Sequence, residues 1–519
     1  MTSKVNKKFA IISVSDKSNI DKIAKKLVKN KYQILSTGGT ARYLASKKVP
    51  TISISTFTGF KEILEGRVKT LHPKIHAGIL AKTVKDLKGL QDNYSLIDMV
   101  IVNLYPFEKV TDNPNCKLTD AIENIDIGGP AMLRAAAKNY KRVTVITDPS
   151  DYGDVINEIE KFGSTKEKTR YHLAQKVFLK ISNYDQSITN YLMKKNSSLM
   201  STLPDSLQLT LEKEQTLRYG ENPHQKGKLY KIKNPKFSGF EYTQVSGKEL
   251  SYNNIVDAES AYSCVQQFTN PACVIVKHAN PCGVSENKLI SKAYDYAYKT
   301  DPVSSFGGII AFNKNLDDKL LKKIINRQFV EVIIAPKVSG KCVKIIKTKP
   351  NIRLLIIKNF NIKAKSFDMK SLKSNFLIQE TDTKIFTKRD LRFVTKKKPS
   401  INQIEDLLFA FKVARYVKSN AIVFAKNKKT LGIGAGQMSR IDSTNIARDK
   451  ARKQKINLDG CVMASEAFFP FRDNVDLANK IGVSSIIQPG GSIKDEEIIS
   501  VVDQHRMSMV FTGTRVFKH

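Results

Sequence analysis

No stretch of the 519-residue sequence is apolar for long enough to span a bilayer, which excludes a protein built on membrane-crossing helices. The apolar stretch after the first basic residues is too short for a signal peptide and runs into Asp16 and Lys17. We therefore expect a cytoplasmic protein. The chain is also too long for one hydrophobic core, and its 41% hydrophobic content suits about two to four globular domains.

The sequence also lacks any C-x-x-C pair. Several of its six cysteines lie in apolar, strand-like runs, such as Cys273 in "ACVIVKH". This pattern predicts reduced thiols, and it argues against both a disulfide framework and a structural zinc site.

Acidic residues are few relative to basic ones, and the formal net charge is +37. Such a charge is compatible with a nucleic-acid-binding protein, or with lysines that cover every solvated face. The basic groups "KKLVKN", "KNYKRV" and "TKKKPS" are dispersed, and no basic stripe is interleaved with aromatic residues. We therefore favour the second interpretation and expect no nucleic-acid partner. A positive field also suits small anionic substrates.

What the sequence does contain is a regular alternation of strands and helices. In the first part, the predicted strands are 8–16, 32–37, 97–107 and 141–148, and predicted helices follow them in 20–30, 38–47 and 125–140. This alternation predicts an α/β fold with a parallel sheet. The Ser/Pro/Lys-rich segment 191–209 is typical of a linker. Buried strands and helical patterns resume after it, in a second α/β part long enough for two lobes.

Turns suited to binding a phosphate follow two strands of the first part. "STGGT", from Ser36 to Thr40, opens a helix, and "SVSDK", from Ser13 to Lys17, ends the preceding strand. Exposed amides and hydroxyls at a helix N-terminus bind anions, although an ordinary strand-helix turn explains either motif alone. Ligands of α/β sheets bind at the carboxyl ends of strands, where both turns are expected to lie.

The segment 65–80, "EGRVKTLHPKIHAGIL", mixes charged residues with buried-type residues and shows no helical amphipathicity. We interpret it as a folded active-site loop. For His72 and His76, packing or capping is the alternative to a chemical role.

Another polar pair ends an apolar strand in the second part. Cys273–Val276 reads as a buried strand that stops at Lys277 and His278, with a turn predicted at 280–283. A cation and an imidazole at a strand end point in diverging directions, so they can address opposite sides of a reacting centre. The alternative is a solvated strand end.

Ten long motifs occur in order along nearly the whole chain, among them "GRVKTLHPKIHAGIL", "IDIGGPAMLRAAAKN", "LRYGENPHQ", "KHANPCG" and "AFFPFRDNVD". In these the sequence resembles the bifunctional purine-synthesis family that combines aminoimidazole-carboxamide ribotide (AICAR) transformylase with inosine monophosphate (IMP) cyclohydrolase. The resemblance implies a methylglyoxal-synthase-like cyclohydrolase domain in 1–195, a linker in 196–208, and two cytidine-deaminase-like transformylase lobes in 209–370 and 371–519.

The transformylase moves a formyl group from 10-formyltetrahydrofolate to the exocyclic amine of AICAR, giving formyl-AICAR (FAICAR). The amine is a poor nucleophile, so the reaction needs a base, a donor for the oxyanion and an acid for the leaving nitrogen. By resemblance, His278 removes the amine proton, Lys277 stabilises charge or protonates the leaving group, and Asn420 orients the formyl oxygen. The resemblance also implies substrate-binding roles for Arg218, Tyr219, Phe306, Gly307, Glu331, Ser439, Arg440, Phe468, Asp473, Asn474 and Arg515.

A zinc deaminase is the rival for this fold, because such enzymes carry H-x-E and P-C-x-x-C. Here the strings are His278-Ala279-Asn280 and Pro281-Cys282-Gly283-Val284. The glutamate and the second cysteine are both missing, so we expect no catalytic metal.

The second reaction closes the ring of FAICAR and expels water. By resemblance its chemistry falls to Lys69, Tyr105, Asp126 and Lys138, although Asp126 is also placed to cap a helix. The implied nucleotide-binding residues are Ser13, Ser15, Lys17, Ser36, Thr37, Gly38, Gly39, Thr40, Arg67, Thr70, Asn103 and Gly128.

The resemblance further implies a homodimer with transformylase sites across the subunit interface, and small-molecule substrates as the only other partners. Glu466 stands where the family usually has Asp, close to a monovalent-cation site. The sequence therefore leaves open whether a structural potassium ion is bound.

Overall fold

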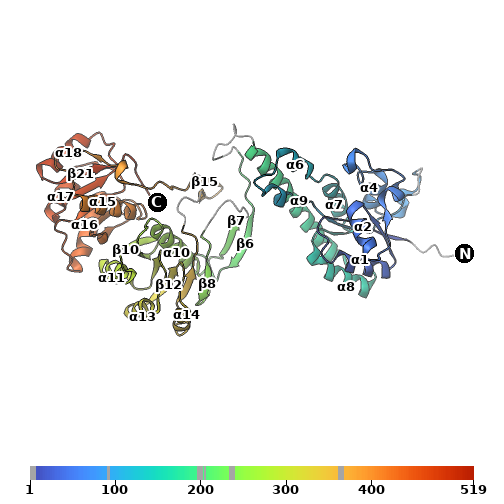
Figure 1. The fold of residues 1–519 in the computed structure, drawn as a ribbon, viewed down its shortest axis with the longest axis horizontal. Helices are drawn as coiled ribbons and strands as arrows, with labels where there is room; N and C mark the ends of the chain where they lie inside the picture. Colours follow the sequence, from blue (N-terminus) through green and yellow to red (C-terminus); the bar gives the residue numbers. More distant parts are fainter. Residues whose placement is uncertain (1–6, 91–93, 196–202, 204–205, 233–239, 361–366) are drawn as a thin grey trace. The chain divides into compact units, whose positions relative to one another are not determined.

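The computed structural model describes residues 7–90, 94–195, 203, 206–232, 240–360 and 367–519. It divides the chain into two compact units, Met1–Gln208 and Leu209–His519, and each is described by itself (Figure 1). Most of the linker predicted at 196–208 lies outside the described residues. None of the described helices is long and apolar enough to cross a membrane.

Unit 1 is built on a five-stranded parallel sheet in the order β3-β2-β1-β4-β5. The strands are β1 Lys8–Val14, β2 Tyr32–Ser36, β3 Ile52–Ser53, β4 Met99–Asn103 and β5 Thr144–Ile146. Successive residues of β1 and β4 are buried, so both faces of the sheet are covered. The parallel α/β fold predicted for the first part is confirmed.

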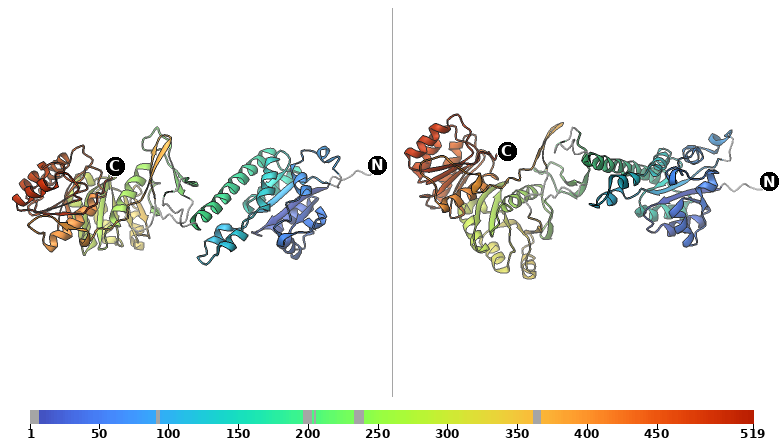
Figure 2. Two further views of the ribbon diagram at one scale, coloured as in Figure 1. Left: turned by 90° about the horizontal axis from the view of Figure 1, so that it is seen from above. Right: turned by 45° about the horizontal axis from the view of Figure 1, so that its top comes forward.

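The helices of unit 1 form two packed groups: α1 contacts α2 and α8, and α7 contacts α4 and the long α9 (Figure 2). Their bounds are α1 Ile20–Lys29, α2 Gly38–Ser46, α3 Ile54–Thr58, α4 Pro73–Leu80, α5 Phe107–Thr111, α6 Leu118–Glu123, α7 Gly128–Lys138, α8 Tyr152–Phe162 and α9 Glu167–Lys195, with short 3-10 turns η1 Leu64–Gly66, η2 Val84–Leu87 and η3 Pro149–Asp151.

One local prediction in unit 1 is wrong. The segment 65–80 is not a loop throughout, because α4 occupies its second half. Pro73 stands in the first turn of α4, and the ring nitrogen Nδ1 of His72 accepts a hydrogen bond from the N–H of Lys74 at 3.1 Å. Proline in the first turn and a capping side chain are ordinary helix starts, and the capping alternative for His72 is confirmed.

Unit 2 is built on one twelve-stranded mixed sheet in the order β16-β21-β20-β19-β17-β18-β10-β9-β11-β12-β13-β8. The strands are β8 Thr243–Ser246, β9 Ala272–Lys277, β10 Asn280–Glu286, β11 Gly308–Phe312, β12 Val330–Ala335, β13 Arg353–Ile356, β16 Arg392–Phe393, β17 Ile422–Lys426, β18 Lys429–Gly434, β19 Val462–Ser465, β20 Ser485–Gln488 and β21 Ser508–Phe511. Two hairpins lie outside this sheet: β6 Leu211–Thr216 with β7 Lys228–Ile232, and β14 Phe367–Leu372 with β15 Asn375–Glu380.

The helices of unit 2 are α10 Tyr252–Val265, α11 Ile290–Thr300, α12 Pro302–Ser305, α13 Asp318–Arg327, α14 Gly340–Ile346, α15 Ile401–Ala414, α16 Arg440–Lys453, α17 Asp473–Ile481 and α18 Asp495–Gln504, with the 3-10 turn η5 Lys388–Asp390. The second α/β part is thereby confirmed.

The large sheet consists of two halves with the same topology. In the first half β9 and β10 form a hairpin, β11 is antiparallel to β9, and β12 and β13 follow in parallel. In the second half β17, β18, β19, β20 and β21 repeat this pattern in the same order. Even the bulges correspond, since Cys282 and Leu431 are the unpaired residues of β10 and β18. The halves meet where β10 pairs with β18.

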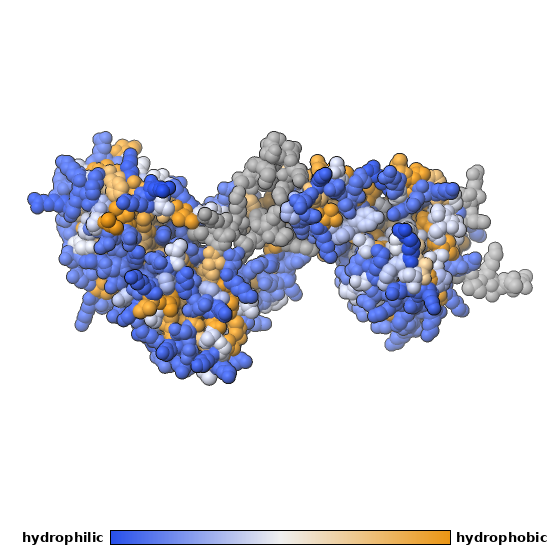
Figure 3. Space-filling model, in the orientation of Figure 1, coloured by the Kyte–Doolittle hydropathy of each residue, from blue (hydrophilic) through white to orange (hydrophobic). Residues whose placement is uncertain are grey.

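Hydrophilic residues cover most of the visible face of both units, and apolar residues appear among them in separate patches (Figure 3). This distribution fits the interpretation of the charge as a solvated surface.

A close approach in the first half of unit 2 requires glycine. A β-carbon at Gly283 of β10 would lie 1.9 Å from the carbonyl oxygen of Ala297 in α11. We predict that Gly283→Ala destabilises unit 2 by about 1–3 kcal/mol, because α11 must move away from the sheet. Faster hydrogen exchange of the β9 and β10 amides would report it.

Gly340→Ala is the matched control, because nothing lies within 4 Å of a β-carbon there. Unchanged exchange in both variants would contradict the close packing of α11 on β10.

Two candidate active sites

In unit 1 the carboxyl ends of neighbouring strands carry a polar cluster. The hydroxyls of Ser13 and Thr37 are 3.1 Å apart. The side-chain oxygen of Asn103 accepts hydrogen bonds from the backbone N–H groups of Ser15, at 2.6 Å, and Asp16, at 2.9 Å. The structure therefore brings together the ends of β1, β2 and β4, as the sequence predicted for strands of a parallel sheet.

Two hydroxyls of this cluster are used within the fold. Ser36 donates to the carbonyl of Ile12 at 2.8 Å, and Thr40 bonds to both the N–H and the carbonyl of Val14 at 3.0 Å. In contrast, a β-carbon at Gly38 or Gly39 would have no neighbour within 4 Å. Gly38 and Gly39 are exposed at the start of α2, so a ligand has access to this helix N-terminus, as anion binding there requires.

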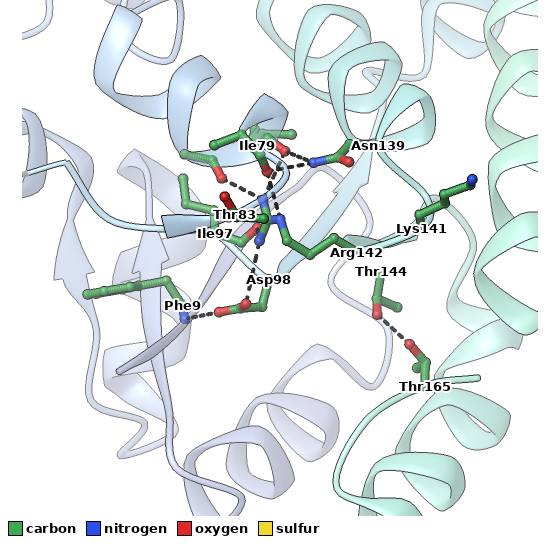
Figure 4. Close-up of polar contacts among 12 residues, drawn as sticks. Phe9, Ile79, Thr83, Ile97, Asp98, Asn139, Lys141, Arg142, Thr144 and Thr165 are labelled. Carbon is green, nitrogen blue, oxygen red and sulfur yellow. Dashed lines mark hydrogen bonds and ion pairs between the residues drawn. The ribbon is translucent and has the colours of Figure 1, made fainter. Parts of the chain in front are cut away.

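An arginine beside the amino-terminal ends of β4 and β5 fixes the C-terminal end of α4. The guanidinium of Arg142 donates to the carbonyls of Gly78, Ile79, Ala81 and Ile97, and Asn139 donates to those of Ile79 and Ala81 (Figure 4). These bonds satisfy carbonyls at the C-terminus of α4, which has no later turn to pair with.

The Arg142 guanidinium also lies 3.5 Å from Asp98, whose pKa is raised by burial although the N–H of Phe9 binds it (Figure 4). This network holds segment 65–80 against the sheet. The other histidine of the segment, His76, has a pKa lowered by burial, and its Nε2 has no partner among the described residues.

Asp126 lies at the N-terminus of α7. Its carboxylate accepts the N–H of Gly129 at 2.8 Å, so the helix-capping role is confirmed. Burial raises the pKa of Asp126, while Lys69 and the N–H groups of Gly129 and Tyr105 lower it. Lys69 and Tyr105 therefore lie close to this carboxylate. Thr70 is also near, since a β-carbon on Gly128 would lie 2.5 Å from its hydroxyl.

One predicted residue of unit 1 lies elsewhere, and another is paired with a carboxylate. Lys138 is exposed at the C-terminal end of α7, about 15 Å along the helix axis from its first residue at 1.5 Å per residue. Within one chain α7 therefore separates Lys138 from Asp126. Arg67 is exposed and forms a two-pronged ion pair with Glu123. Lys17 lies at the sheet edge, 3.4 Å from the carbonyl of Ser15.

In unit 2 the turn predicted at 280–283 is wrong. Asn280 already begins β10 and pairs with Lys277, so the hairpin turn consists of His278 and Ala279 alone. Both residues have left-handed backbone angles, with φ of 51° and 56°. Such a two-residue turn matches the strand twist, and it usually contains Asn or Gly because other residues are strained there.

Lys277 is held at the end of β9. Its ammonium donates to the carbonyl of Gly307 at 2.9 Å. Gly307 has a φ of +66°, and a β-carbon there would lie 3.0 Å from the lysine nitrogen. The half-buried lysine thus depends on a glycine at this position, while His278 stays exposed at the tip.

Asp257 of α10 is a residue that the sequence analysis did not select. Its carboxylate accepts the N–H of Ala279 at 2.7 Å. Burial raises the pKa of Asp257, while His278 and Lys277 lower it. The available signal was a repeated string, because Ser251 and Asp257 recur at the same spacing as Ser400 and Asp406.

Asn420 lies near this hairpin, since the side-chain oxygen of Asn280 accepts the N–H of Lys418 at 2.9 Å. The amide nitrogen of Asn420 donates to the carbonyls of Gln437 and Met438 at 2.9 and 3.1 Å. Both of its N–H donors are therefore used, and the group it offers to a ligand is the carbonyl oxygen, an acceptor.

Arg440 and Glu466 form a buried ion pair at 2.9 Å, and Arg440 also donates to the carbonyl of Phe468 at 3.0 Å. The other carboxylate oxygen of Glu466 is buried with no partner among the described residues. Ser439 caps α16 by accepting the N–H of Asp442 at 3.2 Å.

Asn474 is buried and accepts from Thr444 at 2.7 Å, and it donates to the exposed Asp473 at 2.9 Å. Asn474, Ser439 and Arg440 thus support the local fold in this structure.

Arg218 and Arg515 are exposed. Arg218 stacks on Tyr219 at 4.9 Å and Arg515 on Phe517 at 5.0 Å. Glu331 of β12 accepts the side-chain N–H of Asn254 at 2.7 Å.

Phe306, 64% exposed, contacts Phe329 with ring centroids 5.5 Å apart. Both rings line a cavity of about 500 Å³ together with Tyr298, Arg327 and Lys349. Aromatic walls beside cations suit a flat ligand with anionic groups.

The cysteine of the zinc-like string is not available as a thiolate. Cys282 is buried, and desolvation raises the pKa of its thiol to about 12. Its sulfur contacts the carbonyl of Ile275 and the hydroxyl of Ser305. Within the described ranges, no group of three or more His, Cys, Asp or Glu side chains is arranged to hold a metal ion.

Comparison with known proteins adds three findings. The family model described as "AICARFT/IMPCHase bienzyme" matches residues 136–450, more than half of the chain. The model described as "MGS-like domain" matches residues 19–131. A solved structure titled "Crystal structure of ForH" is similar at 34% identity, over 36% of this chain and 98% of that chain, with a TM-score of 0.33.

Proposed function

The chain belongs to the AICARFT/IMPCHase bienzyme family, and we propose that its two activities are divided between the two units. The family carries out the last two steps of purine synthesis, so the protein is a folate-dependent formyltransferase and an IMP cyclohydrolase. Its first part is MGS-like, with the five-stranded parallel sheet described above. We assign ring closure to 1–195 and formyl transfer to the lobes 209–370 and 371–519.

The observation that carries the formyl-transfer assignment is the tip of the β9–β10 hairpin. Lys277, fixed on the carbonyl of Gly307, and the exposed His278 are adjacent there, close to the cavity lined by Phe306. The amine nitrogen of AICAR forms a bond to the formyl carbon, and His278 accepts the proton that this nitrogen loses. The bond from that carbon to N10 of the folate breaks, and the proton passes to N10. Lys277 stabilises the negative charge on the formyl oxygen.

We propose a different role for Asn420 from the orientation of the formyl oxygen that the sequence implied. Because its N–H groups are bound to Gln437 and Met438, its carbonyl oxygen is the group that meets the substrate. We propose that it accepts a hydrogen bond from the AICAR amine, which orients the nitrogen lone pair towards the formyl carbon.

Exposed guanidinium groups suit the ribotide phosphate, so we assign Arg218 and Arg515 to it, with Tyr219 beneath Arg218. Phe306, Gly307, Glu331, Phe468 and Asp473 are proposed for the substrates' ring systems and amides. We propose that Ser439, Arg440 and Asn474 support the local fold beneath these substrate-binding residues.

Ring closure is proposed at the N-terminus of α7. The carboxamide nitrogen of FAICAR attacks the formyl carbon, and water leaves. Lys69 stabilises the oxygen, and Asp126 and Tyr105 move protons. The phosphate is bound at Gly38 and Gly39, with the ribose and base held by Ser13, Ser15, Lys17, Ser36, Thr37, Thr40, Arg67, Thr70, Asn103 and Gly128.

The position of Lys138 supports a homodimer. Since α7 separates it from Asp126 in one chain, Lys138 reaches a ring-closure site only from a second copy. A dimer in the cytoplasm, as the family resemblance implies, is therefore part of the proposal.

A potassium ion is proposed at Glu466. The donor set fits a cation of single charge, because one buried carboxylate oxygen has no partner among the described residues and the other is shared by Ser419 and Arg440. Bound there, the ion would contact the carboxylate oxygen of Glu466 that has no partner among the described residues.

The separation of the sites is tested by His278→Ala. Formyl transfer should fall by about 100-fold or more, because a general base is lost, whereas ring closure of supplied FAICAR should be unchanged. Product formation from AICAR and from FAICAR is measured separately. Asn427→Ala, at the equivalent turn position of the second half, is the control and should keep both activities. Equal loss of both activities in folded His278→Ala would contradict the assignment.

The ion pair of Arg67 makes a second prediction. In the wild-type protein Arg67 must break its ion pair with Glu123 before it binds the nucleotide. In Glu123→Gln this ion pair is absent. An exposed ion pair is worth about 0.2–1 kcal/mol, so the KM for FAICAR should fall by up to about fivefold.

Glu160→Gln breaks the exposed Lys26–Glu160 pair in the same unit and should leave this KM unchanged. A raised KM in Glu123→Gln would remove Arg67 from the proposed site.

A further inference from the structure

Each half of the unit 2 sheet has the same strained turn. His278 and Ala279 join β9 to β10, and Asn427 and Lys428 join β17 to β18. All four residues have positive φ, between 51° and 56°. For residues other than glycine this conformation costs roughly 1–2 kcal/mol each, so something in the fold must stabilise both turns.

One helix aspartate binds each turn. The carboxylate of Asp257 accepts the N–H of Ala279 at 2.7 Å, and the backbone of His278 contributes to lowering the pKa of this carboxyl group. The carboxylate of Asp406 accepts the N–H groups of Asn427 at 2.8 Å and Lys428 at 2.7 Å. Hydrogen bonds from amides to a charged oxygen are among the stronger ones in proteins.

The two aspartates occupy the same place in matching helices. Helices α10 and α15 each have 14 residues, begin after a capping serine, Ser251 or Ser400, and run to the strand that enters the turn. The structure therefore contains one device twice, a carboxylate on a rigid helix that holds a left-handed turn.

The halves differ in what the turns carry. The first turn follows Lys277 and contains His278, the proposed proton acceptor. In the second, Lys426 donates to the carbonyl of Asp459 at 2.7 Å, as Lys277 does to that of Gly307, but Asn427 replaces the histidine. Lys428 is bound in ion pairs with Glu405 and Glu286. The second turn is therefore a natural control for the first.

We propose that Asp257 is a positioning residue for formyl transfer: by binding the backbone of the His278–Ala279 turn, it fixes the point from which the imidazole reaches the substrate amine. Asp406 gives the second half the same structural support and has no part in the reaction. This inference rests on the proposed function of His278.

The charges around Asp257 agree with this role. Lys277 and His278 lower its pKa against the effect of burial, so both residues lie near the carboxylate. The carboxylate thus holds the turn while it also faces the two side chains assigned to the chemistry.

The test compares Asp257→Asn with Asp406→Asn in the full chain. An asparagine is uncharged and has one acceptor oxygen, so both variants weaken the charge-assisted hydrogen bonds to their turns. We expect kcat for formyl transfer to fall by about 100-fold in Asp257→Asn, because a shift of about 1 Å at a reacting group has that effect. The KM for AICAR should stay within about threefold, since the phosphate-binding arginines lie elsewhere.

Asp406→Asn should keep kcat within about twofold while it lowers the melting temperature at least as much as Asp257→Asn does, because Asp406 accepts two N–H groups of its turn. Ring closure of FAICAR should be unchanged in both.

A rescue separates positioning from direct chemistry. Glycine adopts positive φ without strain, so Ala279→Gly added to Asp257→Asn should restore at least about tenfold of the lost kcat. Ala279→Gly alone provides the reference, and the double variant also covers the case in which Asp257→Asn does not fold.

Two results would overturn the inference. One is a kcat in Asp257→Asn equal to that in Asp406→Asn. The other is a loss that glycine does not restore, which would assign Asp257 to proton transfer. Formyl transfer retained in His278→Ala would instead refute the proposed function itself, so the two failures are distinguishable.

Discussion

The backbone N–H of Ala279, at the tip of the β9–β10 hairpin, is bound by the carboxylate of Asp257. Short hairpin turns with both residues left-handed normally contain Asn or Gly, and here the positions hold His278 and Ala279. The sheet supplies the register, α10 supplies the carboxylate, and the strained turn places an imidazole next to a lysine. The proposed formyl transfer depends on that arrangement, because the turn places the exposed His278, while Lys277 is also held by the carbonyl of Gly307.

Unit 1 uses a different constraint. Parallel strands bring their carboxyl ends to one edge, so Ser13, Thr37 and Asn103 meet although they are far apart in the sequence. Arg142 then holds the end of α4 against the same sheet. Lys138 lies at the opposite end of α7 from Asp126. The same helix geometry that places Asp126 is therefore the reason why the proposed ring-closure site includes a second copy of the chain.

Much of this could be predicted from the sequence because its periodicity is strong. The buried runs around Ile11 and Val100 are strands, and the parallel edge followed from their alternation with helices. Helix α4 was missed because it is short, and its glycine and histidine obscure the apolar spacing. The turn at 278–279 was predicted at 280–283 instead, because Asn280, Pro281 and Gly283 are residues common in turns, although here they form part of β10.

Other features depend on contacts between distant residues. That Asn420 offers an oxygen follows only from its bonds to Gln437 and Met438. The role of Asp257 could be recognised only by comparing the two equivalent halves of the sheet. Few identical residues in the sequence indicate that equivalence. The most direct test is a crystal structure of the full chain with AICAR and a folate analogue bound. The account predicts the His278 imidazole about 3 Å from the AICAR amine, with Ala279 still bound to Asp257. AICAR bound away from Lys277 and His278, or a turn detached from Asp257, would contradict it.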